Sequence, residues 1–168
     1  IGVGGAILLG RRWLVLAAAL AALLLIPPGA VKAQEGLLFE DESRYQFIQV
    51  VERDGVRRLY LDEGLATHSV WREGEVLTGG VWDTYLAVPD LLGRPPDRVA
   101  MLGNAAGTAA RAFARYYPLA RVDGVELDPA VSEAGRRFFE MGRTPTLTVH
   151  DDDARSYLRR TDETYDVI

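Results

Sequence analysis

Residues 101–111 read MLGNAAGTAAR, and the interpretation of the second half of the chain depends on this stretch. An apolar lead-in is followed by small residues and then by good helix formers, which is typical of a tight connection between a strand and a helix. Small residues there let the backbone approach a ligand closely, and the start of the next helix favours a negative or polar group. Taken alone, the stretch is equally compatible with an ordinary tight turn.

Strand and helix patterns alternate from this stretch to the end of the sequence. Strands are predicted at residues 98–103, 121–128, 146–153 and, as the start of a fourth, 165–168, with helices at 108–117, 129–141 and 154–160. Alternation with short loops predicts an α/β fold with a Rossmann-like, doubly wound parallel sheet. Ligands of such sheets bind at the carboxyl ends of the strands.

Three features lie at the carboxyl ends of successive predicted strands. The first is the loop Gly103–Gly107, and the second is Glu126, about 20 residues later, where a carboxylate is placed to accept hydrogen bonds from both hydroxyls of a ribose. The third is the acidic run at residues 151–153, in which an Asp could accept a hydrogen bond from an adenine amine. Each has an ordinary structural explanation, but together they predict an adenosine pocket.

The middle of the chain has the alternation of a small β region. Residues 45–52 and 57–62 are predicted as strands joined through Asp54-Gly55, a strong hairpin signal, and residues 65–71 as a third strand. We expect an antiparallel sheet that packs against the rest of the chain or forms a homodimer. A helix is predicted over residues 81–92, ended by Gly93.

Residues 1–36 differ in composition from the remainder of the chain. The run from Trp13 to Ile26 carries no charge and is preceded by Arg11-Arg12. As a helix it would span about 21 Å, which is shorter than the hydrocarbon core of about 30 Å. Three interpretations remain open: a transmembrane span, a signal peptide cleaved before Gln34, and a buried helix.

The composition argues against several classes of function. The formal net charge is −5 without a long basic block, which disfavours nucleic acid as a partner. The chain has no cysteine and only two histidines, His68 and His150, so we expect neither a disulfide framework nor a metal centre.

The segments SRYQFIQVV, LYLDEG, VAMLGNAAGT, VDGVELDP and VHDDDAR, in this order, resemble the spermidine synthase (polyamine aminopropyltransferase) family. The resemblance covers residues 37–168 and is strongest to the membrane-fused branch, in which transmembrane helices precede the enzyme domain. It implies a β-hairpin region followed by a methyltransferase-like Rossmann domain. The expected domains are residues 1–36 for the membrane segment and linker, 37–80 for the hairpins, and 81–168 for the S-adenosyl-binding part.

The resemblance also implies roles for individual residues. Gln46 would contact decarboxylated S-adenosylmethionine, Glu126 would hold the ribose, and the pair Asp153-Ala154 would meet the adenine. The catalytic Asp of the family would lie beyond Ile168. The full set of expected binding residues is Gln46, Gly103, Gly107, Glu126, Asp153 and Ala154 for the co-substrate, and His68 and Asp83 for the substrate.

Two positions depart from the family pattern. Ala106 stands where the family has an Asp that helps to hold the aminopropyl ammonium, and Val81 stands where it has a Tyr. Transfer of an aminopropyl group to a polyamine is the first expectation. An S-adenosylmethionine-dependent methyltransferase and a non-catalytic membrane sensor for a nucleoside or polyamine are the alternatives. We expect a membrane-anchored protein with its soluble domain in the cytoplasm, or an exported one if the signal-peptide interpretation holds.

Overall fold

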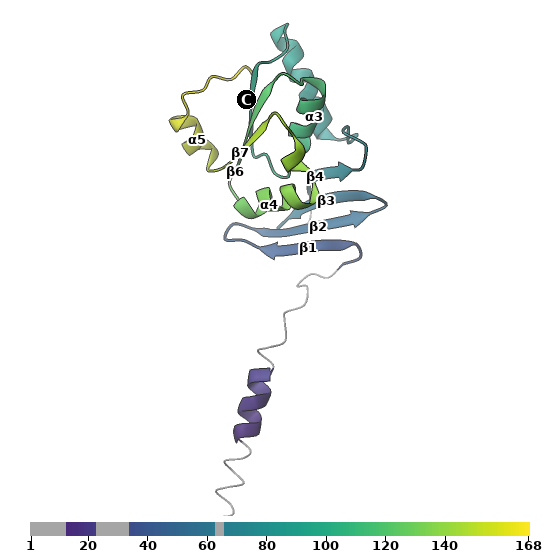
Figure 1. Ribbon diagram of the computed structural model, residues 1–168, viewed down its shortest axis with the longest axis vertical. Helices are drawn as coiled ribbons and strands as arrows, with labels where there is room; N and C mark the ends of the chain where they lie inside the picture. Colours follow the sequence, from purple (N-terminus) through teal and green to yellow (C-terminus); the bar gives the residue numbers. More distant parts are fainter. Residues whose placement is uncertain (1–12, 23–33, 63–65) are drawn as a thin grey trace, which may run out of the picture. The chain divides into compact units, whose positions relative to one another are not determined.

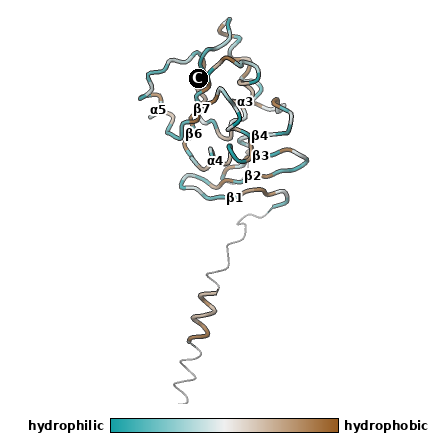
Figure 2. The backbone as a smooth tube through the Cα atoms, viewed as in Figure 1, coloured by the Kyte–Doolittle hydropathy of each residue, from teal (hydrophilic) through white to brown (hydrophobic). Residues whose placement is uncertain are grey.

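The computed structural model describes residues 13–22, 34–62 and 66–168 (Figure 1). The chain divides into two compact units, Ile1–Ala33 and Gln34–Ile168, and each is described by itself. In the first unit, residues 13–22 form a helix of exposed apolar side chains, coloured towards the hydrophobic end in Figure 2. No helix within the described residues is long and apolar enough to cross a membrane. The other parts of the expected membrane or signal segment, residues 1–12 and 23–33, lie outside the described residues.

The second unit begins with a four-stranded antiparallel sheet in which consecutive strands are neighbours. The hairpin between β2 and β3 turns at Asp54 and Gly55, whose positive φ angles of 52° and 72° suit the two-residue turn that Asp-Gly favours. The three predicted strands are confirmed within two residues at each end. The sequence does not predict β1, because LLFEDE lacks a regular alternation of apolar and polar residues. The strands are β1 Leu37–Glu42, β2 Phe47–Arg53, β3 Val56–Leu61 and β4 Thr67–Arg72.

The connection to the second sheet is helical, but only its first turn is an α-helix. Val81–Thr84 forms α2, and Tyr85–Leu92 forms the 3-10 helix η1. The helix predicted over residues 81–92 is therefore confirmed, mostly as a 3-10 helix, and it ends at Gly93 as expected. Pro89 lies inside η1 and has no N–H to donate, so a regular α-helical hydrogen-bond ladder cannot continue through it.

The predicted alternation of strands and helices is confirmed after residue 97. Three parallel strands lie in the order β5-β6-β7, and Val167 pairs with Val99 on the other edge of β5 as an isolated bridge. The predicted fourth strand is thus present only as this bridge. Because the chain steps from β5 to β7 and then returns beyond β5, that edge of β5 is a topological switch point. The elements are β5 Arg98–Leu102, α3 Thr108–Tyr116, β6 Arg121–Glu126, α4 Pro129–Phe138, η2 Met141–Arg143, β7 Leu147–Asp151 and α5 Ala154–Arg160.

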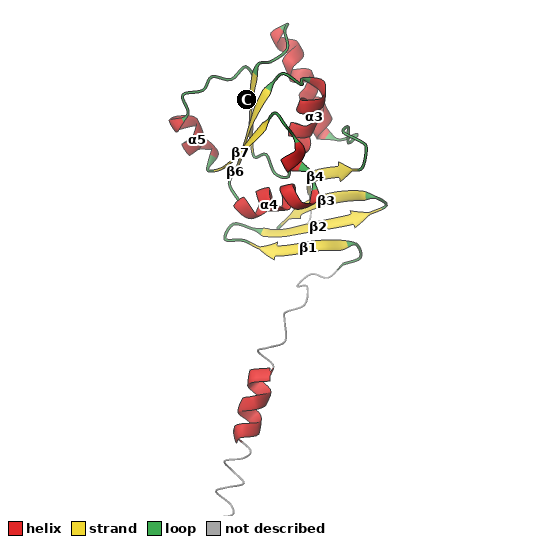
Figure 3. Cartoon of the chain, in the orientation of Figure 1, coloured by secondary structure: helices red, strands yellow, loops and turns green. Residues whose placement is uncertain are grey.

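Two apolar clusters hold the second unit together. One joins the antiparallel sheet to α4, which lies between the two sheets (Figure 3), and consists of Ile48, Val50, Leu59, Ala106, Val131, Ala134 and Phe139. The other packs α3 on the parallel sheet through Val99, Ala110, Phe113 and Val122. The α/β class, with an antiparallel region ahead of a parallel sheet, is confirmed. The domain boundaries predicted after residues 36 and 80 stay predictions.

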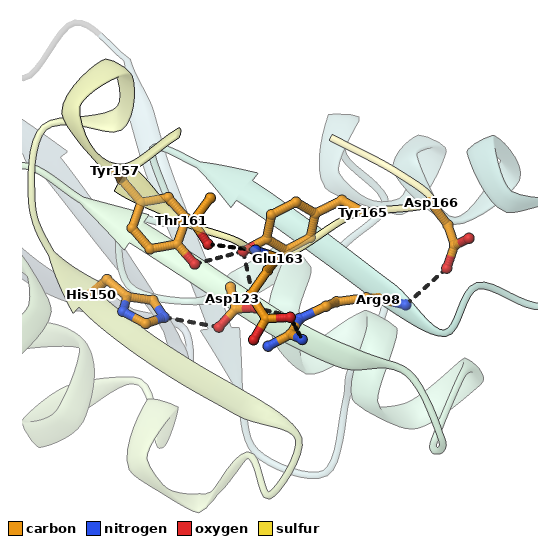
Figure 4. Close-up of polar contacts among 8 residues, drawn as sticks. All are labelled: Arg98, Asp123, His150, Tyr157, Thr161, Glu163, Tyr165 and Asp166. Atoms are coloured by element: carbon orange, nitrogen blue, oxygen red, sulfur yellow. Dashed lines mark hydrogen bonds and ion pairs between the residues drawn. The ribbon is translucent and has the colours of Figure 1, made fainter. Parts of the chain in front are cut away.

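On the face of the parallel sheet that α5 covers, a buried carboxylate forms hydrogen bonds with side chains from several elements (Figure 4). Asp123 is 5% exposed and accepts hydrogen bonds from Arg98 Nε at 3.0 Å and from the Tyr165 hydroxyl at 3.2 Å. Its other oxygen lies 2.8 Å from His150 Nε2. Burial acts to raise the pKa of Asp123, but the hydrogen bonds with His150 and Arg98 outweigh it and hold this pKa below its usual value.

Residues 163–167, which return to the edge of β5, are also held by hydrogen bonds and an ion pair of carboxylates. The Asp166 carboxylate accepts hydrogen bonds from the backbone N–H groups of Asp97 at 2.8 Å and Arg98 at 3.0 Å, and Glu163 forms an ion pair with the Arg98 side chain. Charged hydrogen bonds therefore supplement the single backbone bridge that places Val167 beside β5.

Replacing Asp123 with Asn tests this network. Arg98 and His150 would lose their carboxylate, and we expect the free energy of unfolding at pH 7 to fall by about 2 kcal/mol in urea titrations. The pKa of Asp123 is lower in the folded than in the unfolded protein. Its contribution to the free energy of unfolding is therefore fully present above about pH 4 and is lost as the pH falls through the folded pKa. The difference between parent and variant should therefore shrink in acid. Asp90→Asn, at an exposed position, is the control and should change little; equal stability of the two variants at pH 7 would contradict the assignment.

Candidate functional site

The carboxyl ends of three parallel strands meet at one edge of the sheet. Leu102 pairs with Val125, and Glu126 pairs with Asp151, so the loops after β5, β6 and β7 lie next to one another. The Val125 carbonyl accepts hydrogen bonds from the N–H groups of Gly103 and Asn104 at 2.8 and 3.0 Å. The three sequence features predicted to form a pocket are thus brought to the same edge.

The loop from Gly103 to Gly107 turns sharply into α3. Gly103 and Gly107 have φ angles of 84° and 80°, and Ala105 also lies in the left-handed region at 48°. A Cβ atom on Gly107 would stand 2.8 Å from Met141 Cγ, so both the backbone angle and the available space require glycine there. Holding Ala105 in this conformation costs about 1 kcal/mol, which contacts elsewhere must offset.

Glu126 connects the first two of these loops. It is 8% exposed, and its Oε2 accepts a hydrogen bond from the Ala105 N–H at 2.8 Å while its Oε1 accepts one from the Asp128 N–H at 3.1 Å. The sequence predicts a carboxylate free to hold a ribose; the structure shows one already engaged by two backbone amides. Each carboxylate oxygen has a second lone pair, so the group keeps capacity for further donors.

Asp128 is a polar residue of this edge that the sequence analysis misses. It is 1% exposed; its Oδ1 caps α4 by accepting from the Ala130 N–H at 3.0 Å, and its Oδ2 accepts from Ser43 Oγ at 2.6 Å and Gln46 Nε2 at 3.3 Å. An Asp before Pro129 is a recognisable helix cap, but its link to the antiparallel sheet leaves no local signal. Gln46, expected on the co-substrate, is held by Asp128, whose N–H donates to Glu126.

Asp153 and Ala154 begin α5 after the third strand. Asp153 is exposed and its side chain caps the helix, accepting from the Ser156 N–H at 2.9 Å. This hydrogen bond is the main reason why the pKa of Asp153 lies below its usual value. The neighbouring Asp152 N–H donates to the Glu126 carbonyl at 2.8 Å, which keeps the second and third loops together.

A cavity of about 450 Å³ opens at the switch point of the parallel sheet. His68 from β4 and the loop Gly103–Ala105 line it, together with Trp82 and Tyr85. His68 Nδ1 is buried and has no hydrogen-bond partner within the described residues, which is a costly state for a polar atom unless a ligand or water meets it. The complete lining is His68, Trp82, Tyr85, Val88, Val99, Ala100, Met101, Leu102, Gly103, Asn104, Ala105, Thr108, Ala109, Phe113, Val167 and Ile168.

Two other residues of the sequence analysis do not reach this cavity. The Asp83 carboxylate is held by the preceding turn, where it accepts from the N–H groups of Thr78 at 3.0 Å and Gly79 at 2.7 Å. Ala106 is fully buried in the cluster between the two sheets, and its N–H donates to Ser69 Oγ at 2.9 Å. A side chain at position 106 therefore faces the core in this structure. In the described part of the chain, no group of three acidic or histidine side chains is arranged for a metal ion.

Comparisons with known proteins agree with this architecture. No protein-family model matches the chain. A probable polyamine aminopropyl transferase of Bifidobacterium longum is 33% identical over 136 residues, which cover 80% of this chain and 30% of the relative. The polyamine aminopropyltransferase of Thermococcus onnurineus is 30% identical over 139 residues, covering 78% of this chain and 46% of the relative. The chain thus spans less than half the length of these relatives.

Solved structures show the same fold. A spermidine synthase in complex with the transition-state analogue AdoDATO superposes with a TM-score of 0.62 at 22% identity, covering 79% of this chain and 46% of that one. Spermidine synthase from Thermotoga maritima also gives a TM-score of 0.62 at 22% identity, covering 79% and 45%. The sequence relatives and these structures show that the chain is similar to the spermidine synthase (polyamine aminopropyltransferase) family, in sequence and in fold respectively.

Proposed function

We propose that this chain forms the co-substrate-binding part of an aminopropyltransferase. The enzyme would take an aminopropyl group from decarboxylated S-adenosylmethionine and transfer it to a polyamine. The observation that carries the proposal is Glu126, a nearly buried carboxylate at the carboxyl edge of β6, hydrogen-bonded to the loop that also lines the cavity. The names of the curated relatives and the spermidine synthase bound to AdoDATO support it.

The residues at this edge fit a nucleoside. Glu126 keeps a lone pair on each oxygen for the two ribose hydroxyls, and backbone amides fix its orientation in advance. Leu127, which follows it, is 45% exposed and supplies apolar surface on which a purine can lie. Asp153 and Ala154 at the next strand end remain our candidates for contacts with the adenine, and Gln46 for a contact near the ribose.

The cavity beside the loop is suited to the reacting groups. In the proposed reaction the acceptor amine forms a C–N bond to the methylene beside the sulfonium, the C–S electrons pass to sulfur, and the amine loses a proton. The sulfonium is already a good leaving group, so positioning and proton removal are what the protein supplies. His68 lines this cavity, and in the proposed reaction its imidazole would accept a hydrogen bond from the amine. The family's catalytic Asp would follow Ile168.

We also propose that the apolar run between Trp13 and Ile26 attaches the enzyme to a membrane, as in the membrane-fused branch of the family. The run is uncharged, and its described part, residues 13–22, is helical with exposed side chains. The domain would then face the cytoplasm, where S-adenosyl compounds are made.

Binding of methylthioadenosine, the nucleoside product, tests the role of Glu126. Glu126→Gln keeps the size of the side chain but leaves only one oxygen to accept hydrogen bonds. We expect it to weaken binding by about 1.5–3 kcal/mol, or roughly ten- to a hundredfold in the Kd measured by calorimetry. Glu133→Gln, on the exposed face of α4, is the matched control. Unchanged affinity in Glu126→Gln at an unchanged melting temperature would refute the proposed ribose contact.

Aminopropyl transfer by the full-length enzyme tests His68. If His68 positions the acceptor amine or takes up its proton, His68→Gln should lower kcat/KM by about a hundredfold while leaving the Kd for methylthioadenosine unchanged. His150, the other histidine, contacts Asp123 and does not line the cavity, so His150→Gln is the control, assayed at a temperature at which it is folded. Parallel losses in both variants would point to a general effect on folding instead.

A further inference from the structure

A second, smaller cavity of about 220 Å³ lies where β3 and β4 meet α3 and the segment ahead of α2. We call it the arginine cavity, because Arg58, Arg72 and Arg111 line it, and Glu75 is the single acidic residue among its lining residues. Two positive charges are therefore left over in a space that none of the proposed reaction steps uses. The arginine cavity does not depend on the proposed transferase activity.

Arg111 reaches this cavity from α3, and no described carboxylate forms a hydrogen bond or ion pair with it. Its Nη1 donates to the Phe139 carbonyl at 3.0 Å and its Nη2 to the Val70 carbonyl at 2.6 Å, both of which are neutral acceptors. Burial lowers the pKa of Arg111 to about 10, while the charge of Glu140 acts in the opposite direction. A partly buried guanidinium whose hydrogen-bond acceptors are neutral carbonyls has an incompletely compensated charge, and a bound anion would supply the missing compensation.

Arg58 is the second uncompensated cation. It lies in the middle of β3, between Val51 of β2 and Val70 of β4, and its side chain is half-buried. Across residues 34–62 and 66–168, no hydrogen bond or ion pair of the Arg58 guanidinium is found. Arg72, by contrast, forms an ion pair with Glu75 at 2.7 Å. An arginine held on a strand without a partner keeps its five N–H donors available to an oxyanion.

The remaining walls determine the kind of anion. Val56, Val70, Leu77 and Trp82 add apolar surface beside the guanidinium groups. A bare inorganic ion would leave that surface against water, whereas a small organic molecule with an oxyanion group would cover it. Trp82 also lines the larger cavity at the switch point, so an occupant of the arginine cavity would touch a wall of the candidate substrate site.

We propose that the arginine cavity binds a small organic anion through its carboxylate or phosphate group. Arg58 and Arg111 would hold the anionic group, with Trp82 against the apolar body. Arginine is suited to both oxyanions because its planar fork of donors matches their geometry. The site is distinct from the larger cavity, whose lining contains no arginine or lysine.

Titration of the protein with malonate and, separately, with inorganic phosphate tests the proposal, with ionic strength held constant by sodium chloride. Calorimetry measures affinity, and a change in tryptophan emission that is absent in Trp82→Phe reports contact with Trp82, since the chain has three tryptophans. We expect saturable binding of at least one probe, and an affinity loss of about tenfold or more in Arg58→Gln. Because the Arg58 guanidinium has no hydrogen bond or ion pair among the described residues, this substitution removes no polar contact there, and the melting temperature checks the fold.

Arg121→Gln removes one positive charge from an exposed strand position outside the cavity and is the matched control. Binding of malonate alone would identify a carboxylate site, and binding of phosphate alone a phosphate site; either result supports the proposal if Arg58→Gln weakens it and Arg121→Gln does not. The proposal is overturned if neither probe saturates, or if Arg58→Gln binds as tightly as the parent protein.

Discussion

The loop between β5 and α3 carries backbone N–H groups that must be satisfied by side chains of other elements. The Ala105 N–H donates to Glu126 of β6, and the Ala106 N–H donates to Ser69 of β4. Burial without these acceptors would cost about 1–3 kcal/mol for each group. The loop can therefore keep its shape only when both sheets are in place, and the cavity wall that it forms depends on the antiparallel sheet as much as on the parallel one.

The elements that the sequence predicts are those with a local cause. Asp54-Gly55 forms its turn because two residues with positive φ are what such a hairpin requires, and Pro129 begins α4 where its missing N–H costs nothing. The features that the sequence does not predict, the type of helix at residues 81–92 and the strand β1, also have physical reasons. Apolar periodicity over residues 81–92 indicates a helix without distinguishing an α-helix from a 3-10 helix, and the position of Pro89 decides between them. For β1, pairing with β2 makes the strand, and that pairing has no trace in LLFEDE.

The residues of the candidate site also fall into those with a local sequence signal and those placed by long-range packing. Glu126 is predictable because a carboxylate on the last residue of a buried strand has its position fixed by the strand itself. The contacts of Asp128 with Ser43 and Gln46 join residues more than 80 positions apart, and only the packing of α4 between the sheets brings them together. Ala106 illustrates the limit of reading a motif by alignment alone. Its place in the loop suggests a pocket-facing position, yet its side chain packs with Val131 and Ala134 in the core.

Glu126 shows how one group can serve both the fold and a ligand. A carboxylate has about four acceptor positions, and backbone amides occupy one on each oxygen here. Those bonds fix the side-chain rotamer before any ligand arrives, so binding does not have to order it again. The same bonds occupy one acceptor position on each oxygen and limit which donors can reach the others. A ribose presents two adjacent hydroxyls to the two oxygens of a carboxylate, and this match makes the fold-supporting role of Glu126 compatible with the binding role that we propose.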